Sequence, residues 1–456
     1  MNNEGEAKMK ISVVLVCMMV PFLLLPLFGQ SYGTYSGDLQ VHGFISQGYL
    51  KSTDNNFLGN TEKGTFEFNE FGINFSTELI DQLHVGLQFF ARDLGNLGND
   101  QIQIDWAYGD YRFEDWFGIR AGKMKMPLGL YNEIRDIDML RTTILLPQGV
   151  YNESWRSTFN AIKGIGIYGT VDAGVVGSVS YQGQAGVLNV GPGTGMNKYI
   201  EDQLFAKMNK YDLSTSYVAN VVWDTPMSGL RLSGSGFFTD MRITGNTEDS
   251  EFWRDQTVGA ARDVAGMLGL PPNTWPSTYE EALAFSEAIG VNLDLVGIEI
   301  TQDLKDTKGY WLSGEYTYED LKIAGEYFWL STMARTSNPE LGQLRNFNNK
   351  LGGFYGSVDY RFNDWFEAAS YYSEYYTDLS DKQGKGYEAG FGYPASNSWL
   401  KDLAFSLRFD VNPYWTVKAE GHKMNGTAVM FREDQVDPKN VKEDWYLFAT
   451  KLTFNF

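Results

Sequence analysis

The segment Asp444-Trp-Tyr-Leu-Phe-Ala-Thr-Lys-Leu-Thr-Phe-Asn-Phe456 decides the fold class. Its residues alternate between two faces. One face carries Phe448, Thr450, Leu452, Phe454 and Phe456, and the other carries Leu447, Ala449, Lys451, Thr453 and Asn455. A period of two is the repeat of a β-strand. An apolar face opposite a small and polar face suits a barrel with lipid outside and water inside. A strand that closes a soluble sandwich is the alternative.

The first thirty or so residues have the features of a secretory signal. Two lysines precede an apolar run over residues 11–28, which two prolines interrupt, and small residues follow. We therefore predict a signal peptide over residues 1–33, cleaved near residues 31–33 after Ser31 or Gly33. A retained transmembrane anchor is the alternative, and the prolines argue against it. Because the single cysteine, Cys17, lies inside this run, the mature chain needs no disulfide and offers no thiolate metal cluster.

Composition also favours a strand-based membrane protein. Hydrophobic residues make up 43% of the chain and mean hydropathy is −0.30, so no later run is apolar enough to span a membrane as a helix. Forty-nine glycines and 15% aromatic residues suit closely packed strands and aromatic girdles. The formal net charge of −20 makes nucleic acid an unfavourable partner. Three scattered histidines give no metal-ligand spacing, and we expect no cofactor.

Connections of two lengths alternate along the chain after Asp38. Short turns rich in Asp, Asn, Gly and Pro fall at residues 80–82, 114–116, 172–174, 224–228, 319–320, 363–364 and 412–413. Longer polar segments lie at residues 51–63, 94–100, 125–159, 183–212, 242–308, 333–349, 378–399 and 425–443. This is the plan of an up-and-down barrel in an outer membrane, where short turns face the periplasm and long loops face outside. We therefore expect an all-β transmembrane antiparallel barrel as one domain over residues 34–456.

Counting period-two segments between these connections predicts about sixteen strands. They span approximately residues 38–50, 64–79, 82–93, 101–113, 116–124, 160–171, 173–182, 213–224, 229–241, 309–318, 321–332, 350–362, 365–377, 400–411, 414–424 and 444–456. The large external loop, about residues 242–308, contains two helical stretches. The first runs from Asp255 to Leu268. The second opens on a capping box over residues 277–280 and ends at Gly290.

One segment occurs twice, as Tyr111-Arg-Phe-Glu-Asp-Trp-Phe117 and as Tyr360-Arg-Phe-Asn-Asp-Trp-Phe366. Each copy places an acidic turn among aromatic rings. Rings at a membrane interface keep their apolar body in lipid and their polar edge in water. We interpret both copies as periplasmic turns set in an aromatic girdle.

The segment after the fifth predicted strand holds the most informative motif. Its core, Gly122-Lys-Met-Lys-Met-Pro-Leu-Gly129, resembles the end of strand five in the porin superfamily that includes phosphate-selective and DcaP-like porins. The resemblance implies that the next loop, about residues 125–159, folds into the barrel and narrows a channel. It also implies a homotrimer, with outer-membrane lipid and lipopolysaccharide as surroundings. The ending on Phe454 and Phe456 resembles the signal that barrel-assembly machinery recognises.

A physical reason supports a constriction in this loop. A sixteen-strand barrel has a lumen too wide for wall side chains to fill, so solute discrimination needs a narrow point with fixed charge. The candidates for that constriction are Lys123, Lys125, Glu133, Arg135, Asp136, Asp138 and Arg141. In the alternative interpretation these charges pair with each other and hold the loop to the wall. Because the signs are mixed, the sequence predicts neither an anion nor a cation preference.

Strand parity places further charges on the inner face of the barrel. The predicted lumen wall includes Arg92, Arg120, Arg231, Glu315, Glu326, Arg408, Lys418 and Glu420. Phosphate-selective relatives carry an inward ladder of arginines, and the spacing here does not place these arginines along one path. We expect solvated lumen residues that pair with neighbouring strands.

The sequence therefore predicts an outer-membrane porin through which small hydrophilic, charged solutes diffuse passively. Two alternatives come from other classes. An outer-membrane lipase or esterase would need a catalytic histidine, and His84 shares an inward face with Ser76 and Glu78. No Gly-x-Ser-x-Gly elbow supports that trio, so we expect no enzyme. A plugged adhesive or structural barrel would bind a partner through its loops and would conduct no ions.

Overall fold

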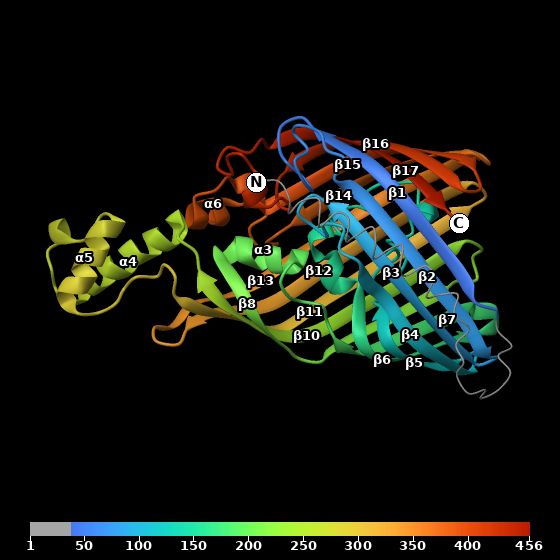
Figure 1. Cartoon of the computed structure of the whole chain (residues 1–456), viewed down its shortest axis with the longest axis horizontal. Helices are drawn as coiled ribbons and strands as arrows, with labels where there is room; N and C mark the ends of the chain where they lie inside the picture. Colours follow the sequence, from blue (N-terminus) through green and yellow to red (C-terminus); the bar gives the residue numbers. More distant parts are fainter. Residues whose placement is uncertain (1–37) are drawn as a thin grey trace, which may run out of the picture. The chain divides into compact units, whose positions relative to one another are not determined.

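The computed structural model describes residues 38–456, so the predicted signal peptide falls outside the described residues. The described chain forms one antiparallel sheet, which closes where β1 (Gln40–Ser52) pairs with both β2 (Phe68–Ile80) and β17 (Asp444–Asn455) (Figure 1). Strands β8 (Ala206–Leu213) and β9 (Ser216–Asp224) pair with successive parts of β10 (Leu230–Thr247). They occupy a single position in the wall, so the barrel has sixteen strand positions and the predicted fold class is confirmed.

The remaining elements follow the predicted order. The other strands are β3 (Leu83–Leu94), β4 (Gln103–Glu114), β5 (Phe117–Lys125), β6 (Ala161–Asp172), β7 (Ser178–Val187), β11 (Glu299–Tyr318), β12 (Leu321–Asn338), β13 (Gly342–Asn363), β14 (Phe366–Tyr376), β15 (Trp399–Asn412) and β16 (Trp415–Gly426). The α-helices are α2 (Arg156–Phe159), α3 (Gly195–Leu204), α4 (Glu251–Met267), α5 (Tyr279–Ile289) and α6 (Lys385–Phe391). None of the helices in the described chain is both long and apolar enough to cross a membrane.

Several strands are longer than predicted at the end with long connections. The predicted loop over residues 333–349 is wrong, because these residues extend β12 and β13 in a continuous ladder. Residues 242–247 and 299–308 likewise belong to β10 and β11, and residues 206–213 form β8. The physical reason is that strand pairing continues beyond the lipid. Both faces of these strand ends meet water or loops, so the period-two apolar pattern used to predict strands disappears there.

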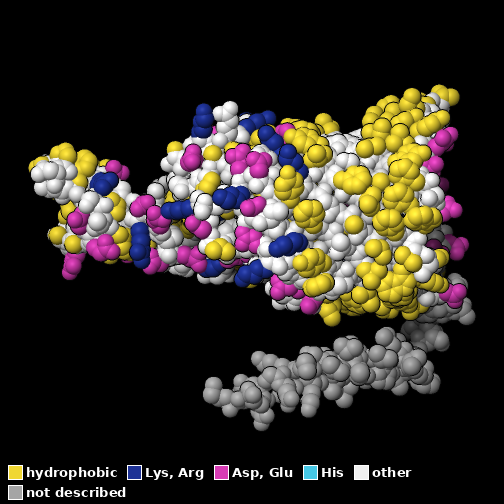
Figure 2. All heavy atoms as spheres, turned by 90° about the horizontal axis from the view of Figure 1, so that it is seen from above, with side chains coloured by type: hydrophobic (Ala, Val, Ile, Leu, Met, Phe, Trp, Pro, Cys, Tyr) yellow, Lys and Arg dark blue, Asp and Glu magenta, His cyan; other side chains and the backbone are white. Residues whose placement is uncertain are grey.

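The outer face of the barrel is apolar. On β17, Tyr446, Phe448 and Leu452 are each 43–53% exposed, whereas Leu447 and Ala449 are buried inside. Figure 2 shows hydrophobic side chains gathered over the barrel toward the end with short turns, and charged side chains toward the other end. A closed sheet leaves no unpaired strand edge, and an apolar outer belt is what a lipid bilayer requires.

The repeated segment forms the same structure in both places. Phe113 stacks on Phe117 at the β4–β5 turn, with ring centroids 5.5 Å apart, and Phe362 stacks on Phe366 at the β13–β14 turn at 5.0 Å. Phe113 and Phe362 are 52% and 57% exposed. The two turns thus present exposed aromatic clusters at the rim with short connections, as expected for interfacial girdles.

The large connection between β10 and β11 carries α4 and α5, which lie beyond the strand ends (Figure 1). The capping box of α5 lies one residue later than predicted. The Thr278 side chain accepts from the Glu281 N–H, and the Glu281 carboxylate accepts from the backbone N–H of Thr278. Gly290 ends the helix in the left-handed region, as the sequence predicts.

Candidate functional site

A single loop fills much of the barrel interior. This inner loop, residues 126–160, leaves β5 and returns to β6, and it contains two short 3-10 helices and α2. Its apolar side chains are buried in the main hydrophobic cluster together with inward side chains of the wall. Examples are Tyr151 and Trp155 from the loop and Phe328 and Tyr375 from the wall, all at most 6% exposed. The loop is therefore packed as a protein core and does not hang free in a lumen.

The base of the inner loop is fixed by a buried cluster of charges. The Lys125 ammonium lies 2.6 Å from an Asp105 carboxylate oxygen on β4 and also pairs with Asp136. The Arg156 guanidinium pairs with Asp136 through Nε at 2.8 Å. Burial opposes ionisation of Asp136, but Arg156 and Lys125 outweigh it and hold the pKa of that carboxyl well below its usual range. These charges neutralise one another and tie the loop to β4.

A second group of ion pairs extends this cluster toward β3. Glu153 lies 2.6 Å from Arg92 on β3 and 2.9 Å from Arg135 of the loop. Burial opposes ionisation of Glu153, but the guanidinium groups of Arg135 and Arg92 outweigh burial and lower its pKa to about 2. The two arginines offset the free-energy cost of burying the Glu153 carboxylate. Loss of one partner would leave a buried charge without full compensation.

Another part of the inner loop reaches β16 and β17. Asp138 lies 3.0 Å from the Lys418 ammonium on β16 and 3.3 Å from the Lys451 ammonium on β17. Thr453 donates to the same carboxylate at 2.8 Å. Lys418 also donates to the carbonyl of Arg141 at 2.7 Å. Asp138 and Lys418 are each at most 1% exposed, so this contact is sealed from water.

Glu420 on β16 holds the backbone of the loop directly. Its two carboxylate oxygens accept from the amide N–H groups of Ile144 and Leu145 at 2.7 and 2.9 Å. On its other side Glu420 lies 3.0 Å from His422 Nε2, while His422 Nδ1 lies 3.0 Å from Asp402. The imidazole sits between two buried carboxylates, which is the environment of a charged, structural histidine.

Glu326 on β12 provides a further anchor. It accepts from the Leu130 N–H at 2.9 Å and from the hydroxyls of Tyr151 and Tyr355 at 2.5 and 2.8 Å. The inner loop is thus attached to β12, β16 and β17 as well as to β3 and β4. We call the inner faces of β12–β17 at the level of this loop the packed wall.

Nearer the end with short turns, the inner faces of β4–β7 form a different surface, which we call the open wall. Here Tyr108, Arg120 and Gln182 remain partly exposed. Glu133 of the inner loop faces this wall, where the Gln182 amide donates to it at 3.4 Å. Burial raises the pKa of the Glu133 carboxyl, and the Arg120 guanidinium offsets part of this effect. Arg120 itself pairs with Asp110 at 2.7 Å.

The predicted constriction residues therefore separate into three groups. Lys125, Arg135, Asp136, Asp138 and Arg141 lie in buried pairs or backbone contacts of the inner loop. Glu133 faces the open wall. Lys123 lies apart from both groups. It is three residues from the inward Arg120, so strand parity places it on the outer face of β5. Its ammonium contacts the carbonyl of Ile104, a residue that is 48% exposed.

The predicted lumen-wall residues lie on the inner face. Arg231 pairs with Asp224 at 2.8 Å and lies 4.0 Å from Glu315, with side chains that are partly exposed. Arg408 donates to the Met139 carbonyl of the inner loop at 2.7 Å. Sequence reasoning missed Asp105, Glu153, Arg156, Asp402 and His422 as members of these networks. Strand parity predicts that His422 faces inward, and the same parity holds for Asp402, but nothing in the sequence indicates their partners.

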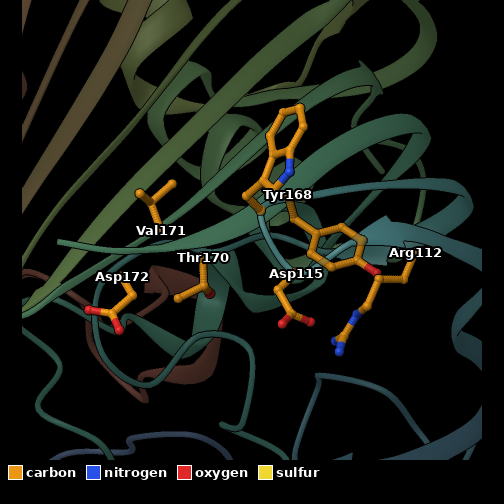
Figure 3. A pocket seen from close by; sticks show the side chains of 7 residues that line it. Arg112, Asp115, Tyr168, Thr170, Val171 and Asp172 are labelled. Carbon is orange, nitrogen blue, oxygen red and sulfur yellow. The ribbon is translucent and has the colours of Figure 1, made fainter. Parts of the chain in front are cut away.

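A hollow of about 790 Å³ opens at the end of the barrel with short turns. Arg112, Asp115, Tyr168 and Thr170 line it, and Figure 3 shows the Arg112 and Tyr168 side chains side by side. Arg112 and Tyr168 belong to the open wall.

The residues of the proposed esterase trio do not form a catalytic arrangement. His84 Nδ1 lies 3.6 Å from Glu78, and their side chains are 47% and 68% exposed. Ser76 pairs in register with Gly86, two residues from His84. In the described chain no hydrogen bond joins Ser76 to His84, so the nucleophile–base contact that defines such sites is missing.

Comparisons with solved structures identify the fold. The barrel matches the outer membrane channel DcaP of Acinetobacter baumannii with a TM-score of 0.51 and 10% identity, over 93% of this chain and 99% of that one. It matches an anion-selective porin from Comamonas acidovorans with a TM-score of 0.50 and 9% identity, over 92% and 100%. This chain has the fold of outer-membrane porins.

Sequence comparison adds little to this result. No family model matches the chain. An uncharacterized protein from Aquifex aeolicus is 23% identical over 199 residues, which is 43% of this chain. The match spans 37% of that relative's length.

Proposed function

We propose that this protein is an outer-membrane channel through which small hydrophilic solutes diffuse passively along the open wall. The single observation that carries the proposal is the asymmetry of the inner loop. The loop is sealed against β12–β17 but leaves polar side chains partly exposed where Glu133 faces β4–β7. A solute would enter through the hollow lined by Arg112 and Tyr168 and pass between Glu133 and Arg120.

The charges along this passage support a selectivity step at Glu133. A fixed charge acts most strongly where few water layers separate it from a passing ion. Glu133 and Arg120 carry opposite signs, so the proposal assigns them opposing effects on ion preference. The buried charges of the loop, such as Asp136 and Asp138, are neutralised by their partners and serve to fix the position of the loop.

The surroundings complete the proposal. An apolar outer belt and exposed aromatic turns suit an outer membrane, with lipid and lipopolysaccharide around the barrel. We also infer a homotrimer and assembly by barrel-assembly machinery, which recognises the strand ending on Phe454 and Phe456. These partners are consistent with the porin fold.

Single-channel recording tests the proposal. Protein extracted from the outer membrane would be inserted into planar lipid bilayers and recorded under a salt gradient. We expect stable ohmic current steps, grouped in threes if the channel is a trimer. A folded barrel, identified by its heat-modifiable band on a gel, that carries no current would overturn the diffusion proposal and favour a plugged barrel.

A further inference from the structure

The external half of the barrel interior contains an apolar cavity that the channel proposal does not use. It has a volume of about 150 Å³. One wall is α3, whose residues Met196, Tyr199, Ile200 and Leu204 recur at helical spacing on one face. The opposite wall is the inner face of β10–β13, and the floor is formed by Trp155 and Phe159 of the inner loop.

The lining of this cavity carries no charge. Its described residues are aromatic, aliphatic or uncharged polar side chains. Several of the polar groups already have partners. Thr307 and Thr332 share a hydrogen bond of 2.7 Å, and Thr336 donates to Gln302 at 2.6 Å. The cavity therefore presents a mainly apolar interior, and its volume matches that of apolar cavities that hold benzene-sized molecules.

One fully buried polar group among the lining residues has no partner in the described chain. The Trp155 indole is 6% exposed, and its Nε1–H has no hydrogen-bond acceptor among residues 38–456. A buried donor without an acceptor costs free energy, so most such groups in proteins have a partner. The rings of Phe159, Tyr199 and Phe328 lie around this indole with centroids 5.9–6.3 Å away, all edge-to-face. An aromatic surface with one free donor suits an aromatic ligand with one acceptor.

The cavity has an accessible side. Phe347 lines it and is 42% exposed, and Asn349 beside it is partly exposed. Both residues lie on the part of β13 that extends beyond the predicted strand, at the end of the barrel with long connections. A ligand could therefore arrive from the external mouth without crossing the inner loop.

We propose that this cavity is a binding site for a neutral, single-ring aromatic molecule that carries one hydrogen-bond acceptor, which the Trp155 indole N–H engages. The size selects one ring, the uncharged lining disfavours anions and cations, and the free donor favours an acceptor. This site is separate from the passage at Glu133, and binding to it does not depend on whether the channel conducts.

The test is fluorine NMR of three probes with the full protein in lipid nanodiscs. The probes are 4-fluoroacetophenone, fluorobenzene and 4-fluorobenzoate, and empty nanodiscs correct for partition into lipid. We expect 4-fluoroacetophenone to bind about threefold to tenfold more tightly than fluorobenzene, because of one added hydrogen bond. We expect 4-fluorobenzoate to bind at least about tenfold more weakly than the ketone, because its charge would be buried unpaired.

Variants identify the site. Ala334→Phe fills the cavity and should abolish binding, whereas Met333→Phe, on the outward face of the same strand, should leave it unchanged. If Ala334→Phe does not fold, Met196→Trp on α3 fills the same space. Trp155→Phe should keep fluorobenzene binding and remove the preference for the ketone. Equal binding by the wild type and a folded, cavity-filled variant would overturn the proposal, as would equal affinity for ketone and fluorobenzene. Loss of conductance alone would not bear on it.

Discussion

The packed wall and the open wall carry the same kinds of residue but different chemistry. On the packed wall, Glu420 and Lys418 are at most 4% exposed and engage the inner loop through short contacts. On the open wall, the Arg120 side chain remains 24% exposed and lies near Glu133 of the inner loop. Both walls alternate apolar and polar residues in sequence. Their difference comes from the position of the inner loop, which buries one set of charges in its own contacts and leaves the other partly exposed, although Arg120 there also pairs with Asp110.

This comparison shows that inward charge alone does not make a selectivity filter. A charge that is neutralised by a buried partner acts weakly on a passing ion, whereas a partly exposed charge acts directly.

The largest effect is expected from Asp138→Ala. This change leaves Lys418 buried without a carboxylate and leaves Lys451 with Glu70 alone, which costs about 3–5 kcal/mol of stability. The free energy of unfolding would be measured by tryptophan fluorescence in urea, with the protein in phospholipid vesicles. Asp224→Ala, which removes the exposed partner of Arg231, is the matched control, and it should cost less than about 1 kcal/mol. Equal costs for the two variants would contradict the burial of the loop contact.

A second large effect is expected from Glu420→Ala. Two amide N–H groups of the inner loop, at Ile144 and Leu145, would lose their acceptor at about 1–3 kcal/mol each. The loop should then move, and open-channel current noise and mean conductance should both rise. Glu315→Ala, on the inner face but without a contact to the loop backbone, should leave the noise unchanged. If the open-channel current noise of Glu420→Ala equals that of the wild type, the position of the loop does not depend on Glu420.

Ion preference should respond to the open wall and not to the packed wall. Removing one unit charge near a passing ion changes its free energy by about 1 kcal/mol, so the permeability ratio should change about fivefold. Glu133→Gln should shift the reversal potential toward anions, and Arg120→Gln should shift it toward cations. Glu326→Gln, in the packed wall, should leave the reversal potential unchanged. A larger shift from Glu326→Gln than from Glu133→Gln would reverse the roles assigned to the two walls.

Lowering the pH should change the ion preference before it lowers the stability. The pKa of Glu133 is raised by burial, so this group loses its charge first as pH falls from 7. Glu153 has a lowered pKa of about 2, so its contribution to stability is complete above the ordinary carboxylate range and is lost only as pH approaches that value. Reversal potentials should therefore shift toward anions before the unfolding free energy falls. The shift should be absent in Glu133→Gln, and its persistence there would assign it to another group.

The smallest effect is expected from His84→Ala. His84 is half exposed and contacts only Glu78 at 3.6 Å among the charged groups of the described chain. The unfolding free energy should remain within about 0.5 kcal/mol of the wild-type value. The conductance should equal that of the wild type within measurement error. Hydrolysis of a short-chain ester by the wild type that disappears in His84→Ala would instead revive the enzyme alternative.

The barrel could be predicted from sequence because its signal is local. In β3, β16 and β17 each residue faces lipid or the interior according to its parity, so the alternation can be read directly. The alternation is lost where the strands leave the lipid. Strands β10–β13 continue above the lipid without an apolar face, and α3 was hidden in a polar loop.

The site could be predicted only in part, because its contacts are not local. Parity identified Lys418 and Glu420 as inward, and the motif after β5 identified the loop. Nothing in the sequence indicates that Asp138 meets Lys418, a residue 280 positions away. Strand parity from Arg120 places both Lys123 and Lys125 on the outer face of β5. Lys125 departs from this parity, because it is the last residue of β5 and its ammonium reaches Asp105 and Asp136. Which charges are neutralised depends on these long-range contacts.

Cysteine accessibility tests the central claim most directly. Because Cys17 is the only cysteine and lies in the predicted signal peptide, single cysteines can be placed at will in the barrel. Gln182→Cys places a thiol on the open wall beside Glu133, and Ser406→Cys places one on the packed wall behind Glu420. A charged methanethiosulfonate reagent, added during single-channel recording, should reduce the current of Gln182→Cys and leave Ser406→Cys unchanged. A block of Ser406→Cys with no effect on Gln182→Cys would contradict the account.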